Sequence, residues 1–176
     1  VQKTKITIGN SIKALSRIEI IVPEDLENQY KLLKDLEKNY EKEIGTYWKN
    51  NPTKIHKWVV SHKGIGDILA AKILSQIDFS KTPKVSSLWA YAGLTPNSKK
   101  RKGKKANWNQ YLKFACHQLS DCFIKCRTPK YRDIFDYEKR KQMKNPDISK
   151  NHAHNRAKRK SVIVFLRDLF LREKKN

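Results

Sequence analysis

The stretch that most constrains the fold runs from Ser61 to Leu74, with the sequence SHKGIGDILAAKIL. It indicates the end of one apolar helix, a turn framed by Gly64 and Gly66, and the start of a second apolar helix. This is the sequence form of a helix-hairpin-helix, in which we expect both glycines to adopt positive φ and to let the backbone approach a second molecule closely. The N–H groups that begin the second helix then form a site for phosphate.

Charge near this turn favours a nucleic-acid backbone as the ligand. Lys63 and Lys72 place positive charge on either side of a bound phosphate. The alternative is a tight helical turn that binds nothing, because a Gly-x-Gly between apolar helices also reverses the chain. The residues predicted to contact DNA here are Lys63, Gly64, Ile65, Gly66 and Lys72.

The whole chain is strongly basic. Its 176 residues include 39 Lys and Arg against 17 Asp and Glu, which gives a net charge of +22. Such a charge opposes compaction unless a polyanion neutralises it, and nucleic acid is the leading candidate. A membrane surface fits less well, because the basic residues cluster on polar segments and not opposite a clean apolar stripe.

Features of a secreted or membrane protein are absent from the sequence. No apolar run approaches the roughly 18 residues of a spanning helix, and the N-terminus has no signal-peptide pattern. Cys116, Cys122 and Cys126 fit reduced thiols. We therefore predict a cytoplasmic, nucleoid-associated protein of a prokaryote or of an archaeal virus host.

Apolar residues recur at helical spacing along most of the chain, so we predict an all-α fold. A long helical arm is expected at about 24–48, within a first domain of residues 1–52. Ahead of the arm, Lys5–Ile8 has a weak β pattern and a short helix is expected from Asn10 or Ser11 to Ile18. The arm carries a single stripe of Leu26, Tyr30, Leu33, Leu36, Tyr40, Ile44 and Tyr47. Such a stripe needs a partner, either this chain or, as in a coiled coil, a second copy in a homodimer.

The second domain, residues 53–176, is expected to be a helical domain that contains the hairpin. After the hairpin helices at about 54–62 and 67–77, we predict a short helix at 88–92 stopped by Gly93, and a helix capped within 107–109 that runs to about Cys126. A helix is expected at 131–137 and should end where a run of charged residues begins. A last helix at about 152–173 completes the domain.

Basic residues gather in three clusters, at 99–105, 139–144 and 156–160. Three clusters in one small chain favour a shared polyanion surface over separate solvated charge runs. Contacts of this kind give affinity and salt dependence, not sequence specificity. The cluster residues predicted to bind DNA are Lys99, Lys100, Arg101, Lys102, Lys104, Lys105, Arg156, Arg159 and Lys160.

Metal-dependent chemistry is not indicated in this chain. No group of carboxylates suits a metal pair, and the cysteines and histidines lack the paired spacing of a structural zinc site. We therefore predict no metal site and no cofactor here.

An ordered set of motifs carries a family resemblance. The set comprises Gly64-Ile65-Gly66 with Ala70-Ala71, the stretch LWAYAGLTP at 88–96, a basic loop, Asn107-x-x-x-Tyr111-Leu112-Lys113, and the closing residues 152–166. Over about residues 58–171 it resembles the C-terminal domain of bridge-RNA-guided insertion-sequence transposases, especially the archaeal-type variants. The arm is similar to the coiled-coil segment that these enzymes place between their two catalytic regions.

The resemblance implies a recombinase that combines a RuvC-like DEDD domain with a serine nucleophile that becomes joined to DNA. The serine at the matching place is Ser98, after Gly93-Leu94-Thr95-Pro96, although Lys99 and Lys100 follow where the family usually has Ser-Gly. Lys100, Arg101 and Lys102 would stabilise the charge of the transition state, while no base is adjacent in sequence. A RuvC-like domain, with its Mg²⁺, would have to be separate from this chain.

Three functions remain open on the sequence. The first is the DNA-binding domain of a transposase or site-specific recombinase, as a fragment or as a relic without activity of its own. The second is a stand-alone architectural or regulatory nucleic-acid-binding protein of a virus or plasmid. The third is an RNA-binding module that holds a guide RNA.

Overall fold

The computed structural model describes residues 1–96, 98, 100 and 102–175, and all its regular elements are α-helices. No strand occurs in these described residues, so the predicted all-α fold is confirmed. Contacts divide the chain into two compact units, Val1–Asn50 and Asn51–Asn176. Each unit is described by itself below.

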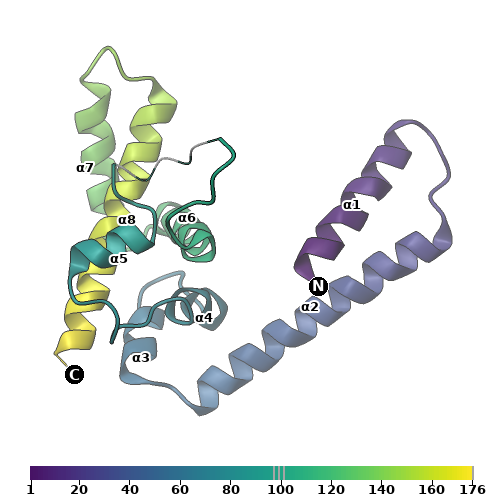
Figure 1. Cartoon of the computed structure of the whole chain (residues 1–176), viewed down its shortest axis with the longest axis horizontal. Coiled ribbons are helices and arrows are strands. Elements are labelled where there is room, and N and C mark those ends of the chain that lie inside the picture. The colour runs from purple at the N-terminus through teal and green to yellow at the C-terminus, as the bar shows by residue number, and fades with distance from the viewer. Residues whose placement is uncertain (97, 99, 101, 176) are drawn as a thin grey trace. The chain divides into compact units, whose positions relative to one another are not determined.

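The first unit is an antiparallel helical hairpin of α1 (Gln2–Arg17) and α2 (Glu24–Asn50), shown in Figure 1. Lys5 forms an ion pair with Glu37 across the hairpin. The expected weak β segment at 5–8 is wrong, because α1 is continuous. Its partly buried Ile8, Ile12 and Leu15 recur at spacings of four and three, which is the period of a helix and not of a strand.

The apolar stripe of α2 is only partly covered by α1. α1 has 16 residues against 27 in α2, so it cannot follow α2 to its end. Tyr30 packs against Gly9 of α1, whereas Leu36, Tyr40 and Ile44 further along are exposed. The arm therefore pairs within the chain at its start and leaves an apolar face on its second half.

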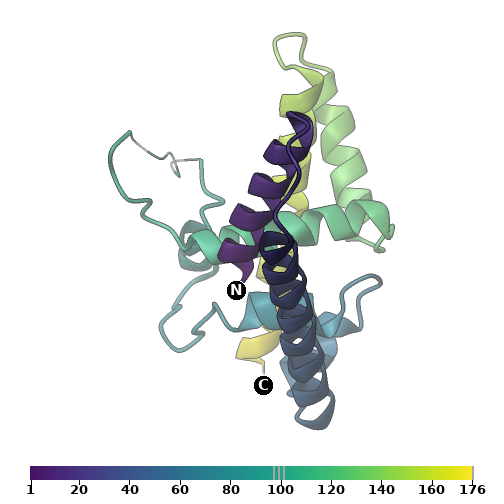
Figure 2. The same ribbon diagram turned by 90° about the vertical axis from the view of Figure 1, so that its right-hand side faces the viewer.

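The described residues of the second unit form six helices. They are α3 (Lys54–Val60), α4 (Asp67–Leu74), α5 (Val85–Tyr91), α6 (Gln110–Lys125), α7 (Tyr131–Met143) and α8 (Lys150–Lys174). α7 and α8 lie side by side in both views (Figures 1 and 2), and α8 also contacts α3, α5 and α6. The last helix is thus the element on which the unit is assembled.

Aromatic side chains join four of these helices in the core. Phe165 of α8 lies 5.5 Å from Trp58 of α3 and 5.3 Å from Tyr131 of α7, measured between ring centroids. Phe123 of α6 stacks on Tyr131 at 4.7 Å. Such ring pairs stabilise a fold beyond the apolar area that they bury.

Some helix ends differ from those predicted from the sequence. The expected cap of α6 is present, since the Asn109 side chain accepts a hydrogen bond from the Leu112 N–H at 2.9 Å. α7 does not dissolve after Tyr137 but continues through the charged residues to Met143. The extended part contacts α8, since Arg156 of α8 donates to Gln142 Oε1 at 3.0 Å.

Candidate nucleic-acid interface

The glycine hairpin forms, and its two glycines differ. Gly64 has φ of +88°, as expected, whereas Gly66 has φ of −93° and ψ of 172°. Positive φ at Gly66 is therefore wrong, and this residue is an ordinary extended N-cap of α4. The side chain of Ile65 is buried in the core.

Gly64 makes a close approach within the protein itself. A Cβ atom there would lie 2.5 Å from Cβ of Cys126 and 2.9 Å from Sγ of Cys122, both on or next to α6. The Cys122 thiol donates to the Gly64 carbonyl at 2.9 Å, and the buried Thr128 hydroxyl donates to the Lys63 carbonyl at 2.7 Å. These contacts hold the turn against the α6–α7 corner.

A carboxylate lies in the first turn of α4. Asp67 Oδ1 is 3.2 Å from Nε2 of the buried His56 in α3. A negative side chain already interacts favourably with the positive end of a helix dipole. An incoming phosphate would meet that charge, which weakens the argument for an anion site at this turn. Lys63 is exposed and Lys72 is half-buried.

A pocket of about 560 Å³ lies among the segment after α5, helix α6 and helix α8. We call it the basic pocket. Its lining residues are Gly93, Leu94, Thr95, Pro96, Ser98, Lys113, Cys116, His117, Ser120, Asn155, Lys158, Arg159 and Val162. Parts of the chain that are far apart in sequence therefore meet around Ser98.

Ser98 is held by the turn that follows α5. Its Oγ lies 2.8 Å from Thr95 Oγ1, and its N–H donates to the Thr95 carbonyl at 3.1 Å. Gly93 begins this turn with φ of +66°. Trp89 of α5 donates from Nε1 to the Ile163 carbonyl of α8 at 3.1 Å. This bond anchors α5, the helix that precedes the turn, on α8.

Positive and proton-accepting groups surround the basic pocket. Lys158 is only 8% exposed and donates from Nζ to Asp121 Oδ1 at 2.6 Å. Burial alone would raise the pKa of Asp121, but the hydrogen bond and charge of Lys158 lower it overall. His117 Nδ1 lies 3.3 Å from Asp121 Oδ2, and its Nε2 lies 3.4 Å from Lys158 Nζ. An imidazole oriented by a carboxylate is a candidate general base.

Two further cations lie beside this network. Lys113 is placed over the Trp108 ring, 4.3 Å from its centroid, and Arg159 is exposed at the rim. Among the residues that the structure describes, neither has a carboxylate partner. The pocket therefore has the charge for an anion such as a phosphodiester.

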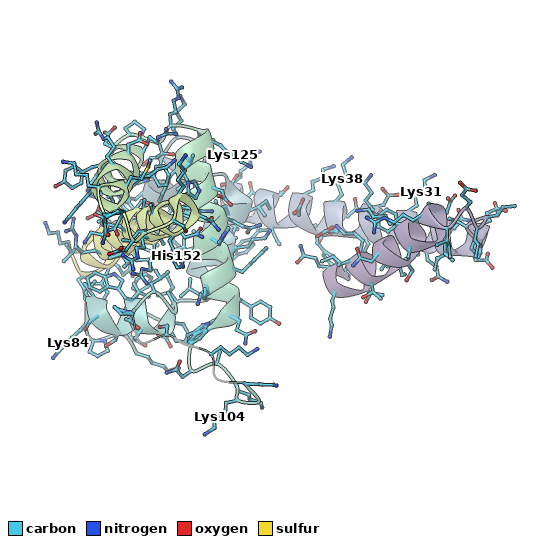
Figure 3. All side chains as sticks on the ribbon, turned by 90° about the horizontal axis from the view of Figure 1, so that it is seen from above. Lys31, Lys38, Lys84, Lys104, Lys125 and His152 are labelled. Atoms are coloured by element: carbon cyan, nitrogen blue, oxygen red, sulfur yellow. The ribbon has the colours of Figure 1, made fainter. Side chains whose placement is uncertain are left out.

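The basic clusters are placed only in part. Of the first, Lys99 and Arg101 lie outside the described residues, while Lys100, Lys102, Lys104 and Lys105 are exposed. Figure 3 shows Lys104 pointing away from the helices.

The second and third clusters lie together. Arg156 of α8 donates to Gln142 Oε1 of α7 at 3.0 Å, which brings residues 139–144 beside residues 156–160. Arg156 and Lys160 are exposed, and Arg159 reaches the basic pocket.

Sequence reasoning missed three residues of the basic pocket: Lys113, His117 and Lys158. Lys113, His117 and Ser120 occur at spacings of four and three, which places them on one face of α6. His117 and Asp121 are also four apart. Lys158 belongs to the basic cluster at 156–160, but nothing in the sequence indicated its burial, because a lysine within a basic run is normally exposed.

The described cysteines are free thiols. Burial raises the pKa of Cys116 in the pocket wall to about 12, which keeps it protonated and unreactive. In the part of the chain that the structure describes, no three His, Cys, Asp or Glu side chains converge as metal ligands. None of the described helices is long and apolar enough to span a bilayer.

Residues 56–133 match the model of the transposase IS116/IS110/IS902 family. This match supports a transposase-family domain in the second part of the chain, and such a domain implies interaction with DNA. It spans α3 to the start of α7 and includes Ser98, whereas Lys158 and Arg159 lie beyond it. No curated protein and no solved structure matches the chain.

Proposed function

We propose that residues 51–176 are the DNA-binding, serine-bearing domain of a transposase or site-specific recombinase. The observation that carries this proposal is the basic pocket, which Ser98 lines together with Lys113, Lys158 and Arg159. The family match includes the serine and supplies the link to transposition. DNA is the partner, and its phosphates bind at this pocket and along the basic clusters.

The chemistry assigned to the pocket is attack of a serine on a phosphodiester. The Ser98 oxygen forms a bond to phosphorus, and the bond from phosphorus to one strand breaks and releases a hydroxyl end. His117, oriented by Asp121, accepts the serine proton and then donates a proton to the oxygen of the departing strand, which leaves as a hydroxyl. Lys113, Lys158 and Arg159 stabilise the additional negative charge on the phosphoryl oxygens.

The family resemblance extends the proposal to further partners. A RuvC-like DEDD domain outside this chain would bind Mg²⁺, and a bridge RNA would guide the complex. A second copy of the chain would cover the exposed stripe of α2. The setting that fits these partners is the nucleoid in the cytoplasm of a prokaryote. No metal or cofactor is assigned to the residues of this chain.

A covalent adduct tests the serine. The chain is incubated with a nicked or suicide DNA duplex, together with a RuvC-like domain of the family, and the expected product is a Ser98 peptide that carries a nucleotide by mass spectrometry. Ser98→Ala should abolish the adduct, while Ser86→Ala, at an exposed serine of α5, should keep it. No adduct with the partner domain present would leave a stand-alone architectural or regulatory nucleic-acid-binding protein as the better account.

Salt dependence and competition test the partner. Duplex affinity should fall steeply with salt, and Lys158→Gln or Arg159→Gln should reduce the slope of that dependence. Structured RNA is then compared with duplex DNA as a competitor at one fixed salt concentration. Preferential displacement by RNA would favour a module that holds a guide RNA.

The hairpin is tested separately at Gly66. Replacing this exposed residue by a bulky one should weaken duplex binding if its backbone meets phosphate, and the helical circular dichroism should survive because no described atom lies within 4 Å of a Cβ there. Unchanged affinity would show that the hairpin does not contact DNA. The proposal for the basic pocket would not be affected.

A further inference from the structure

One part of the second unit combines exposed aromatic rings with an absence of negative charge. No Asp or Glu occurs between Asp78 and Asp121. Within this stretch Tyr91 is 45%, Tyr111 is 79% and Phe114 is 58% exposed. Large aromatic side chains that lie together on a surface are typical of a binding site.

Two of these rings, Tyr91 and Tyr111, border a second pocket, of about 390 Å³, between the end of α5 and the start of α6. We call it the aromatic pocket. It is lined by Tyr91, Ala106, Asn107, Trp108, Asn109, Gln110 and Tyr111. It shares no lining residue with the basic pocket.

The walls of the aromatic pocket are held in place by Asn109. Its N–H donates to the Tyr91 carbonyl at 2.8 Å, and its side-chain amide donates to the Tyr91 hydroxyl at 2.8 Å. The same amide donates to Gln76 Oε1 at 3.1 Å. The ring of Tyr91 is thus fixed while much of its surface stays in solvent.

Tyr111 and Phe114 present aromatic surface from one face of α6, since they are three residues apart. Trp108 is less accessible, because Lys113 covers its ring and a Cβ at Gly93 would lie only 2.7 Å from its Cγ. Tyr111 therefore offers the most exposed ring face beside the pocket.

Charge and polarity at this pocket favour nucleic acid over a protein partner. Lys104 and Lys105 directly precede Ala106, and Lys104 points into solvent (Figure 3). Asn107 and Gln110 add amide groups that donate and accept hydrogen bonds. Aromatic faces beside a positively charged backbone path are the arrangement by which proteins bind unpaired bases.

We propose that the aromatic pocket binds an unpaired nucleobase, which stacks on Tyr111 while Lys104 and Lys105 contact the flanking phosphates. This inference rests on the proposed binding of nucleic acid, but not on attack by Ser98. It assigns to the chain a preference for single-stranded or unpaired nucleotides next to the basic pocket.

Binding of a labelled single-stranded oligonucleotide, measured by fluorescence anisotropy at one fixed salt concentration, tests the site. Loss of one stacked base corresponds to about 1–3 kcal/mol, so Tyr111→Ala should weaken binding by at least about fivefold. Tyr111→Trp should restore it. Tyr137→Ala is the matched control, because Tyr137 is 64% exposed on α7 and lies outside the aromatic pocket.

A strand of the same length that lacks bases separates stacking from charge. The unsubstituted chain should bind this abasic strand more weakly than the normal strand, and Tyr111→Ala should cause no further loss. Equal affinity of the Tyr111→Ala variant and the unsubstituted chain for the normal strand would overturn the proposal and favour a protein partner at these rings.

The two proposals fail in different ways. If Tyr111→Ala weakens binding while no Ser98 adduct forms, the base site stands and the catalytic role falls. If the adduct forms and Tyr111→Ala binds as tightly as the unsubstituted chain, the catalytic role of Ser98 stands and the base site falls. Circular dichroism checks that the exposed substitutions leave the helices intact.

Discussion

Gly64 and Gly66 are equivalent in the sequence pattern, but only Gly64 needs to be glycine in the structure. We expect Gly64→Ser to destabilise the protein by at least about 2 kcal/mol, because a non-glycine residue in the left-handed region costs about 1–2 kcal/mol and its Cβ would also lie 2.5 Å from Cβ of Cys126. The free energy of unfolding from urea titration measures the effect.

Gly66→Ser is the matched control for this prediction. Gly66 has ordinary backbone angles at the N-cap of α4, where serine is a preferred residue. The control should leave stability unchanged or slightly increased. Equal destabilisation by both substitutions would contradict the assignment of the tight contact to Gly64 alone.

His154 should make stability depend on pH. Burial and the charges of Lys139 and Lys158 lower the pKa of His154 below its usual 6.5. Because the unfolded chain then takes up the proton first, stability should fall as pH falls through about 6.5. Between about pH 7.5 and about pH 5.5, we expect the melting temperature of His154→Gln to fall less than that of the unsubstituted protein. An equal loss in both proteins would assign the pH dependence to other groups.

The sequence predicted a residue with an unusual backbone conformation, but it did not predict residues whose role depends on burial. The positive φ of Gly64 was predictable because glycine is the residue that adopts it readily. The contact between the buried His56 and the partly buried Asp67 was not predictable, since 11 positions separate the two residues and a sequence contains no distances. Lys158 is buried because neighbours from α6 cover it, and periodicity within α8 does not report neighbours.

Among the elements, the corner between α6 and α7 contacts the hairpin turn through two hydrogen bonds, and the buried hydroxyl of Thr128 donates one of them. Thr128→Val keeps the shape of the side chain but leaves the Lys63 carbonyl without the 2.7 Å hydrogen bond from Thr128 Oγ1. We expect a loss of about 1–3 kcal/mol in the free energy of unfolding.

Thr128→Ser retains the hydroxyl and should recover most of that loss, apart from the contribution of one methyl group. Both variants are compared by urea titration. A serine variant as unstable as the valine variant would show that packing of the methyl group, and not the hydrogen bond, fixes the corner.

Helix ends were predictable where a local side chain sets them. Asn109 caps α6 as expected from its type and place. α1 and α7 were misjudged because their extent depends on partners: α1 lies along α2, and α7 is continued by its contacts with α8. Tertiary packing of this kind overrides local preference.

For the whole molecule, the exposed stripe on α2 leads to a prediction about assembly. If a second copy covers Leu36, Tyr40 and Ile44, then Leu36→Glu with Ile44→Glu should convert a dimer to a monomer, because two charges would be buried without partners. Multi-angle light scattering of the full chain measures the mass.

Lys38→Gln with Lys42→Gln is the control for the assembly prediction. It changes the net charge by the same amount on a different face of α2, and it should leave the mass unchanged. A monomeric unsubstituted chain would show that the α1–α2 hairpin needs no second copy.

The basic pocket could not be predicted from the sequence, because three separate segments of the chain form it. Its walls come from residues 93–96 with Ser98, from 113–120 and from 155–162, and each segment has a recognisable pattern of its own. Helical periodicity shows which face of a helix is apolar, but it does not show which faces meet. Ser98 could be named through resemblance, whereas the His117–Asp121–Lys158 network required the fold.

The position of α8 has a practical consequence for gene design. A coding sequence cut at residue 133, where the family match ends, would encode a polypeptide without Phe165, Leu166 and Leu169, which are completely buried. Such a product would expose the core on α3, α5 and α6 and should accumulate as insoluble material in an expression host. Cloning boundaries for this domain are therefore best chosen beyond the last helix.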